Sequence, residues 1–122
     1  PGWERHVIAR NLAHMINVAE WDTDGDGIPE LALAHEFDSN TQQSAGVISV
    51  LHHKGDPRQP WSVKEIDHLP TSHRLRWADI DGSGHKVLIN APLTGDSTIL
   101  SSDGPRKIMP IKLGESLSTS CK

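Results

Sequence analysis

An acidic, glycine-rich stretch occurs twice in this chain, and its repetition constrains the fold more than any other feature of the sequence. The first copy covers residues 22–30 and reads DTDGDGIPE, and the second covers residues 79–84 and reads DIDGSG. Carboxylates at alternating positions offer oxygen ligands to a hard cation, and the glycines between them let the backbone curl around it. A motif that occurs twice in one chain, with several dozen residues between its copies, indicates an array of repeated units. We refer to the two copies as the first and second acidic loops.

The spacing within the first acidic loop excludes an EF-hand. An EF-hand places a bidentate acid at its twelfth loop position and a helix on each side. Counted from Asp22, that position is Leu33. The flanking segments 15–19 and 31–34 are short apolar runs, which favour buried strands over amphipathic helices. We therefore expect a loop that closes at Glu30 between two antiparallel strands.

The expected metal ligands are oxygen atoms at alternating loop positions, and the expected ion is Ca²⁺ or Mg²⁺. In the first acidic loop they come from Asp22, Asp24, Asp26, the carbonyl group of Ile28, and Glu30. In the second they come from Asp79, Asp81 and Ser83. Ser83 replaces the third aspartate there, and Val87 stands where Glu30 stood, so we expect weaker binding. The alternative is a glycine-rich turn whose aspartates form only Asx turns.

The segments between the loops predict an all-β fold. Four short strands are expected at residues 31–36, 46–51, 61–67 and 75–79, separated by turn-rich stretches. A recurring order of residues precedes the loops, namely Trp3, Ile8 and His14, then Trp61, Ile66 and His73. Four short strands per repeat are typical of a β-propeller blade. We expect about two four-stranded antiparallel blades over residues 1–114, followed by a polar tail over residues 115–122.

A closed propeller needs about 4–8 blades, more than this chain holds. We therefore expect a fragment of a larger propeller, or a chain that associates with other copies as a homo-oligomer. With 12 basic and 16 acidic residues the formal net charge is -4, which argues against a nucleic-acid partner. No apolar run approaches the ~20 residues of a membrane span, so no membrane contact is expected. The compartment stays open, with an extracellular or periplasmic location favoured.

Strand direction divides the histidines between the two ends of the expected sheets. His52 and His53 close the strand at 46–51 and therefore lie beside the acidic loops. The other end collects a set that we call the histidine rim, made of His14, His35, His68 and His73. Imidazoles gathered there could transfer protons near neutral pH or bind a transition metal such as Zn²⁺. The alternative is that each histidine is hydrogen-bonded separately, with no shared site.

The sequence also carries a resemblance to known propeller families. Residues 21–31, preceded by His14, resemble the FG-GAP/VCBS class of propeller repeats, whose Ca²⁺ loop lies between the first two strands of a blade. Residues 71–82 and 87–93, together with Pro60 and Trp61, resemble the propeller domain of the fungal aldos-2-ulose dehydratase/isomerase family. This resemblance implies a seven-bladed propeller followed by cupin domains, which would be the chain's missing partners.

Two functions follow from the residues and the resemblance. The first is a carbohydrate lyase that removes water from a small sugar substrate such as 1,5-anhydrofructose or glucosone. Such an elimination needs a base and an acid next to a carbonyl group, and the histidine rim would supply both. The second is a non-catalytic, Ca²⁺-stabilised interaction module. A rim whose histidines share one pocket would favour the lyase.

Overall fold

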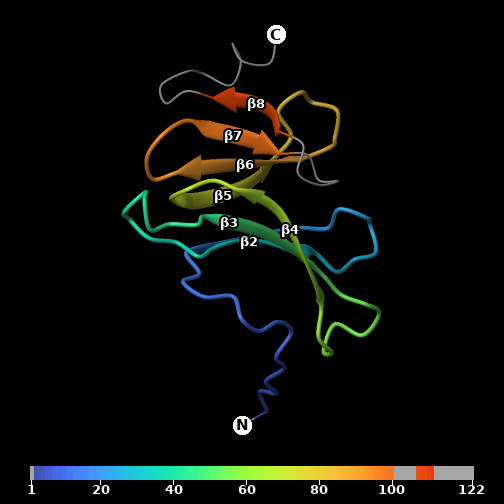
Figure 1. The fold of residues 1–122 in the computed structure, drawn as a ribbon. Coiled ribbons are helices and arrows are strands. Elements are labelled where there is room, and N and C mark those ends of the chain that lie inside the picture. The colour runs from blue at the N-terminus through green and yellow to red at the C-terminus, as the bar shows by residue number, and fades with distance from the viewer. Residues whose placement is uncertain (1, 101–106, 112–122) are drawn as a thin grey trace.

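The computed structural model describes residues 2–100 and 107–111, and these residues form two four-stranded antiparallel sheets stacked on each other (Figure 1). The first sheet contains β1 (Asn17–Trp21), β2 (Glu30–His35), β3 (Val47–His52) and β4 (Ser62–His68). The second contains β5 (Ser72–Ala78), β6 (Val87–Pro92), β7 (Ser97–Leu100) and β8 (Lys107–Ile111). The described part of the chain has no helix that could cross a membrane. The expected tail over residues 115–122 lies outside the described residues.

The strands follow the sequence prediction closely. The segments expected at 31–36, 46–51 and 61–67 correspond to β2, β3 and β4, each displaced by a single residue. The segment expected at 75–79 is longer than predicted, because β5 begins at Ser72. Ser72 and Arg74 also pair with β6, across an irregularity in the register that the polar sequence did not reveal. The all-β class and the grouping into four-stranded antiparallel sheets are confirmed.

Strand register brings three parts of the first sheet together at one end. Trp21 of β1 pairs with Glu30 of β2, so the first acidic loop connects these two strands as expected. Leu31 of β2 pairs with Leu51 of β3. The next residue of β3, His52, therefore lies beside Glu30 at the base of the loop.

The core lies between the two sheets. Its buried residues come from both sheets: Ala19, Ala32, Ala34, Ile48 and Ile66 from the first, and Leu75, Leu88 and Leu100 from the second. Two polar contacts cross this boundary: the Leu75 N–H donates to the Asn17 side-chain oxygen at 2.8 Å, and the Trp77 indole N–H donates to the Ala19 carbonyl at 3.3 Å. These contacts fix β5 against β1.

The N-terminal segment departs from the expected repeat. Trp61 and Ile66 stand just before and within β4, whereas residues 2–16 form no strand and Trp3 is 98% exposed. The segment contacts β2 through the Ile16 N–H, which donates to the Ala34 carbonyl at 3.0 Å, and its Ile8 carbonyl accepts the N–H of Trp61, just before β4, at 2.7 Å. A strand needs a neighbour to pair with. β4 has β3 beside it, while the corresponding segment before β1 has no such partner in the described chain.

Candidate metal centre

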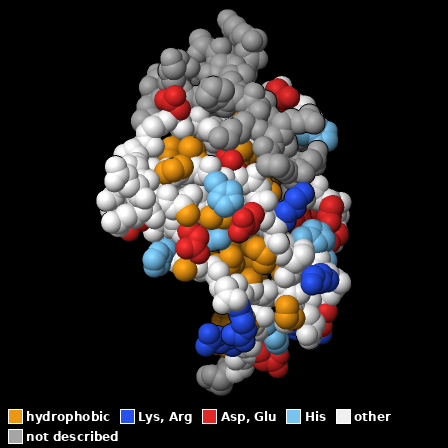
Figure 2. Space-filling model, viewed as in Figure 1, with side chains coloured by type: hydrophobic (Ala, Val, Ile, Leu, Met, Phe, Trp, Pro, Cys, Tyr) orange, Lys and Arg blue, Asp and Glu red, His pale blue; other side chains and the backbone are white. Residues whose placement is uncertain are grey.

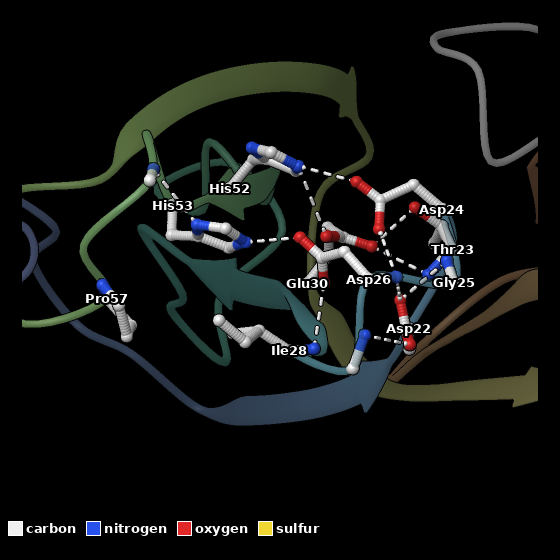
Figure 3. Close-up of polar contacts among 12 residues, drawn as sticks. Asp22, Thr23, Asp24, Gly25, Asp26, Ile28, Glu30, His52, His53 and Pro57 are labelled. Carbon is white, nitrogen blue, oxygen red and sulfur yellow. Dashed lines mark hydrogen bonds and ion pairs between the residues drawn. The ribbon is translucent and has the colours of Figure 1, made fainter.

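Asp22 organises the first acidic loop by accepting backbone hydrogen bonds (Figure 3). Its Oδ1 accepts from the N–H groups of Gly25 at 2.8 Å and Asp26 at 3.2 Å, and its Oδ2 accepts from Gly27 at 2.8 Å. Asp24 and Asp26 each repeat the pattern with one oxygen. Asp24 Oδ1 accepts from the Asp26 N–H at 3.1 Å, and Asp26 Oδ1 accepts from the Ile28 N–H at 2.8 Å. Each of these two carboxylates thereby keeps one oxygen, its Oδ2, outside the turn.

Glu30 closes the loop from the buried side. Its exposed fraction is only 2%, because it is the first residue of β2 and lies beneath the loop. Glu30 Oε2 accepts hydrogen bonds from the Thr23 N–H at 2.7 Å and from the Thr23 hydroxyl at 2.5 Å. Its other oxygen, Oε1, is buried and has no hydrogen-bond partner among the described residues. A buried carboxylate oxygen without a hydrogen bond is costly, and a bound cation would offset that cost.

Two imidazoles from the end of β3 face the remaining carboxylate oxygens (Figure 3). His52 Nε2 lies 3.0 Å from Asp24 Oδ2 and 3.4 Å from Glu30 Oε1. His53 Nε2 lies 2.5 Å from Asp26 Oδ2. The two rings are stacked, with centroids 4.9 Å apart and planes 12° apart. Three oxygens and two nitrogens therefore converge beside the loop.

The two histidines interact with different carboxylates of the loop. The Gly55 N–H donates to His53 Nδ1 at 3.1 Å, so the hydrogen of a neutral His53 ring resides on Nε2 and is donated to Asp26. His53 thus serves Asp26 as a hydrogen-bond donor. His52 interacts mainly with Asp24, whose hydrogen bond raises the pKa of His52. The same bond holds the pKa of Asp24 below its usual range.

The described residues that could hold a metal ion gather at this one loop. Three overlapping groups have ligand atoms within 4.8 Å of one another. The first contains Asp22, Asp24, Asp26 and Glu30, the four acidic side chains predicted from the sequence. The others add imidazoles, and they are Asp24, Glu30 and His52, and Asp26, His52 and His53. The carbonyl of Ile28, also predicted as a ligand, stays a prediction.

The second acidic loop has the same backbone but fewer ligands. Asp79 accepts from the Gly82 and Gly84 N–H groups, both at 2.8 Å, as Asp22 does in the first loop. Asp81 accepts from the Ser83 N–H at 3.0 Å, and hydrogen bonds with Ser83 lower the pKa of Asp81. No metal-capable group of acidic, histidine or cysteine side chains forms here within the described ranges. Ligation by Asp79, Asp81 and Ser83 stays a prediction.

The four members of the histidine rim make no contact with one another through their imidazoles in the described part of the chain. His35 and His68, which end β2 and β4, both align with Val47 of β3, so they share the end of the sheet away from the first acidic loop. Buried His35 lies 2.8 Å from Ser49 Oγ, and exposed His68 lies 3.1 Å from a Glu65 oxygen. The His73 ring lies edge-on to the Phe37 ring, with centroids 5.5 Å apart. Exposed His14 contacts the same residue through its backbone, because its carbonyl accepts the Phe37 N–H at 3.2 Å. No contact joins two of these four imidazoles in the described chain. A catalytic or Zn²⁺ role for the rim stays a prediction.

The acid–imidazole contacts were missed at the sequence level, although His52 and His53 were correctly expected beside the loops. The alternating acids indicate ligands within the loop itself, whereas His52 and His53 reach the loop from another strand of the sheet. The signal was the His-His pair directly after β3's apolar run, at the register position opposite Glu30. The second repeat has no such pair in its sequence: the residues that follow Leu100, at the end of its third strand, are Ser101 and Ser102.

No family model, curated protein or solved structure matches this chain.

Proposed function

We propose that this chain is a divalent-cation-binding segment of a repeated β-sheet array, in which a hard cation such as Ca²⁺ stabilises the β1–β2 hairpin. One observation carries the proposal: Glu30 is buried beneath three alternating aspartates, and its Oε1 has no hydrogen bond. Carboxylate oxygens that converge in this way are the ligands that Ca²⁺ prefers. A cation there would connect the end of β1 to the start of β2.

The finer architecture is also part of the proposal. We infer that the two sheets are adjacent blades of a β-propeller, completed by repeats outside this chain. Each sheet is an up-and-down arrangement of four strands, and consecutive sheets stack face to face (Figure 1). Each also carries its acidic loop between its first two strands. These features support a blade-like repeat.

A cation-stabilised module is better supported than a sugar dehydratase. The dehydratase proposal, which the family resemblance implies, needs a base and an acid that reach one substrate. His14 and His73 would take those roles, and both lie next to Phe37, but no contact joins their two imidazoles among the described residues. The acidic loop, in contrast, has its side chains already assembled.

Thermal unfolding with and without Ca²⁺ tests the proposal. We expect saturating Ca²⁺ to raise the melting temperature of the wild-type chain, because a ligand that binds only the folded state stabilises it. Asp24→Asn removes a charged ligand from the first acidic loop and should abolish most of this shift. Asp81→Asn makes the same change at the equivalent position of the second acidic loop and serves as the control. A wild-type chain whose melting temperature does not respond to Ca²⁺ would refute the proposal.

A further inference from the structure

The contacts of His52 point to a more specific property of the first acidic loop. Ca²⁺ sites are built from oxygen ligands, whereas imidazole nitrogen suits Zn²⁺ and related transition metals. We propose that His52 Nε2, an Asp24 oxygen and Glu30 Oε1 form a transition-metal site, so that this loop binds Zn²⁺ as well as a hard cation. The inference rests on the proposed cation-binding function of the loop and adds the class of metal that it accepts.

The distances between the donor atoms suit such an ion. Zn²⁺ lies about 2.0–2.2 Å from nitrogen and carboxylate ligands. Two ligands about 2.1 Å from one ion are therefore separated by about 3.0 Å at an octahedral angle and about 3.4 Å at a tetrahedral angle. His52 Nε2 lies 3.0 Å from Asp24 Oδ2 and 3.4 Å from Glu30 Oε1. These two separations match those of ligands on one ion, and the Asp24 and Glu30 oxygens of the set lie within 4.8 Å of each other.

Burial supplies an independent argument for a ligand at this point. The Glu30 side chain is 3% exposed, while those of His52 and Asp24 are 44% and 45% exposed. The site thus has a buried floor, formed by an oxygen without a hydrogen bond, and a solvent-facing mouth. Ions could reach it directly from water. Three protein ligands with an open side also leave room for water in the remaining coordination positions.

His53 has a supporting role in this arrangement. Its Nδ1 accepts the Gly55 N–H, so its Nε2 donates a hydrogen to Asp26 and is not free to bind a metal. Metal-binding carboxylates are commonly oriented by such outer hydrogen bonds. His53 therefore positions Asp26 and is excluded from the donor set. Asp24 and Glu30 belong both to the group of four acidic side chains and to the group that contains His52. Zn²⁺ and Ca²⁺ should therefore compete for the loop.

Calorimetric titration with ZnCl₂ and, separately, CaCl₂ at one fixed pH tests the inference. We expect His52→Ala to weaken Zn²⁺ binding by about 10-fold or more, the least effect expected from the loss of a direct ligand. Ca²⁺ affinity should change little, because the oxygen ligands remain. His6→Ala is the matched control, since the His6 side chain is also exposed, at 38%, and its Nε2 lies 3.4 Å from a carboxylate oxygen of Glu4. It should leave both affinities unchanged and reports on adventitious Zn²⁺ binding by surface histidines.

Co²⁺ provides a second readout that does not depend on heats of binding. Its visible absorption changes when nitrogen enters the coordination shell, so the wild-type spectrum should differ from that of His52→Ala and match that of His6→Ala. Zn²⁺ binding that is equally strong in His52→Ala and the wild type would overturn the inference, because His52 would then be only a hydrogen-bond donor to Asp24. Ca²⁺ binding without any Zn²⁺ binding would also overturn it but leave the proposed function intact. Zn²⁺ binding through His52 without a Ca²⁺ response would support the inference and refute the hard-cation proposal. A chain that binds neither ion would refute both.

Discussion

Gly46 is the position at which a single added carbon should damage this fold most. It precedes β3 with a φ of 62°, in the left-handed region that other residues adopt at a cost. A Cβ on Gly46 would overlap the Leu69 carbonyl oxygen and would lie 2.5 Å from the Leu69 carbonyl carbon and 2.9 Å from Pro70 Cα. All of these are backbone atoms, so no side-chain rotation can relieve the overlap.

Gly46→Ala should lower the free energy of unfolding by an amount that depends on the hydrogen bonds it breaks. The Gly46 N–H donates to the Glu36 carbonyl at 3.1 Å, and its own carbonyl accepts the Leu69 N–H at 2.9 Å. Separating these segments loses two hydrogen bonds at about 1 kcal/mol each. Left-handed backbone strain at a residue with a Cβ adds about 1–2 kcal/mol. The total of about 3–4 kcal/mol corresponds to a fall in melting temperature of roughly 12 °C or more for a domain of this size.

Thermal and urea unfolding, followed by circular dichroism, would measure this effect. Gly82→Ala is the matched control, because Gly82 has a similar φ of 76° but nothing within 4 Å of its Cβ position. Gly82→Ala should lower the free energy of unfolding only by the left-handed backbone strain, about 1–2 kcal/mol. Equal destabilisation by the two substitutions would show that Leu69 and Pro70 do not lie against Gly46, and would refute this account of the junction.

Three further predictions follow from the described contacts. Glu30→Gln should weaken Ca²⁺ binding by about 10-fold or more in calorimetry, equivalent to about 1.4 kcal/mol, whereas Glu65→Gln on the exposed face of β4 should not. An unchanged affinity would remove Glu30 from the ligand set. Asn17→Ala should cost about 1–3 kcal/mol in urea unfolding, because the Leu75 N–H loses its acceptor between the sheets, and a neutral result would contradict that role. The isolated chain should self-associate in sedimentation experiments, since the outer strands of its sheets have a free edge among the described residues; a monomer that unfolds cooperatively would count against this and against the blade proposal.

The strands were predictable because each is a short apolar run bounded by turn residues. The run over residues 46–51, for example, begins after a polar stretch and ends before the Lys54 turn, and β3 begins and ends one residue later than predicted. The loop between β1 and β2 was predictable for a different reason. Aspartates alternating with glycines favour a turn, because the carboxylates accept hydrogen bonds from nearby backbone N–H groups. Local sequence therefore determined both features.

Contacts between segments distant in sequence were not predictable in the same way. The approach of His52 to Asp24 depends on the register between β2 and β3, and a shift of one residue would turn the imidazole to the other face of the sheet. The N-terminal segment shows the converse. Trp3 and Ile8 repeat the spacing of Trp61 and Ile66, yet they form no strand, because pairing depends on a neighbouring strand as well as on local sequence.

The hydrogen bonds within the acidic loops have a consequence for how a cation would bind. Asp22 and Asp79 each accept hydrogen bonds from the N–H groups of the two glycines that follow them, and these glycines have nearly identical φ values, 76° and 88° in the first loop and 76° and 87° in the second. The turn thus takes one shape whether its sequence carries four carboxylates or two. A cation would meet a preorganised loop and would lose little affinity to chain ordering. Conversely, a repeat could exchange its outer ligands, as Ser83 exchanges for Asp26, without altering the hairpin that the sheet requires.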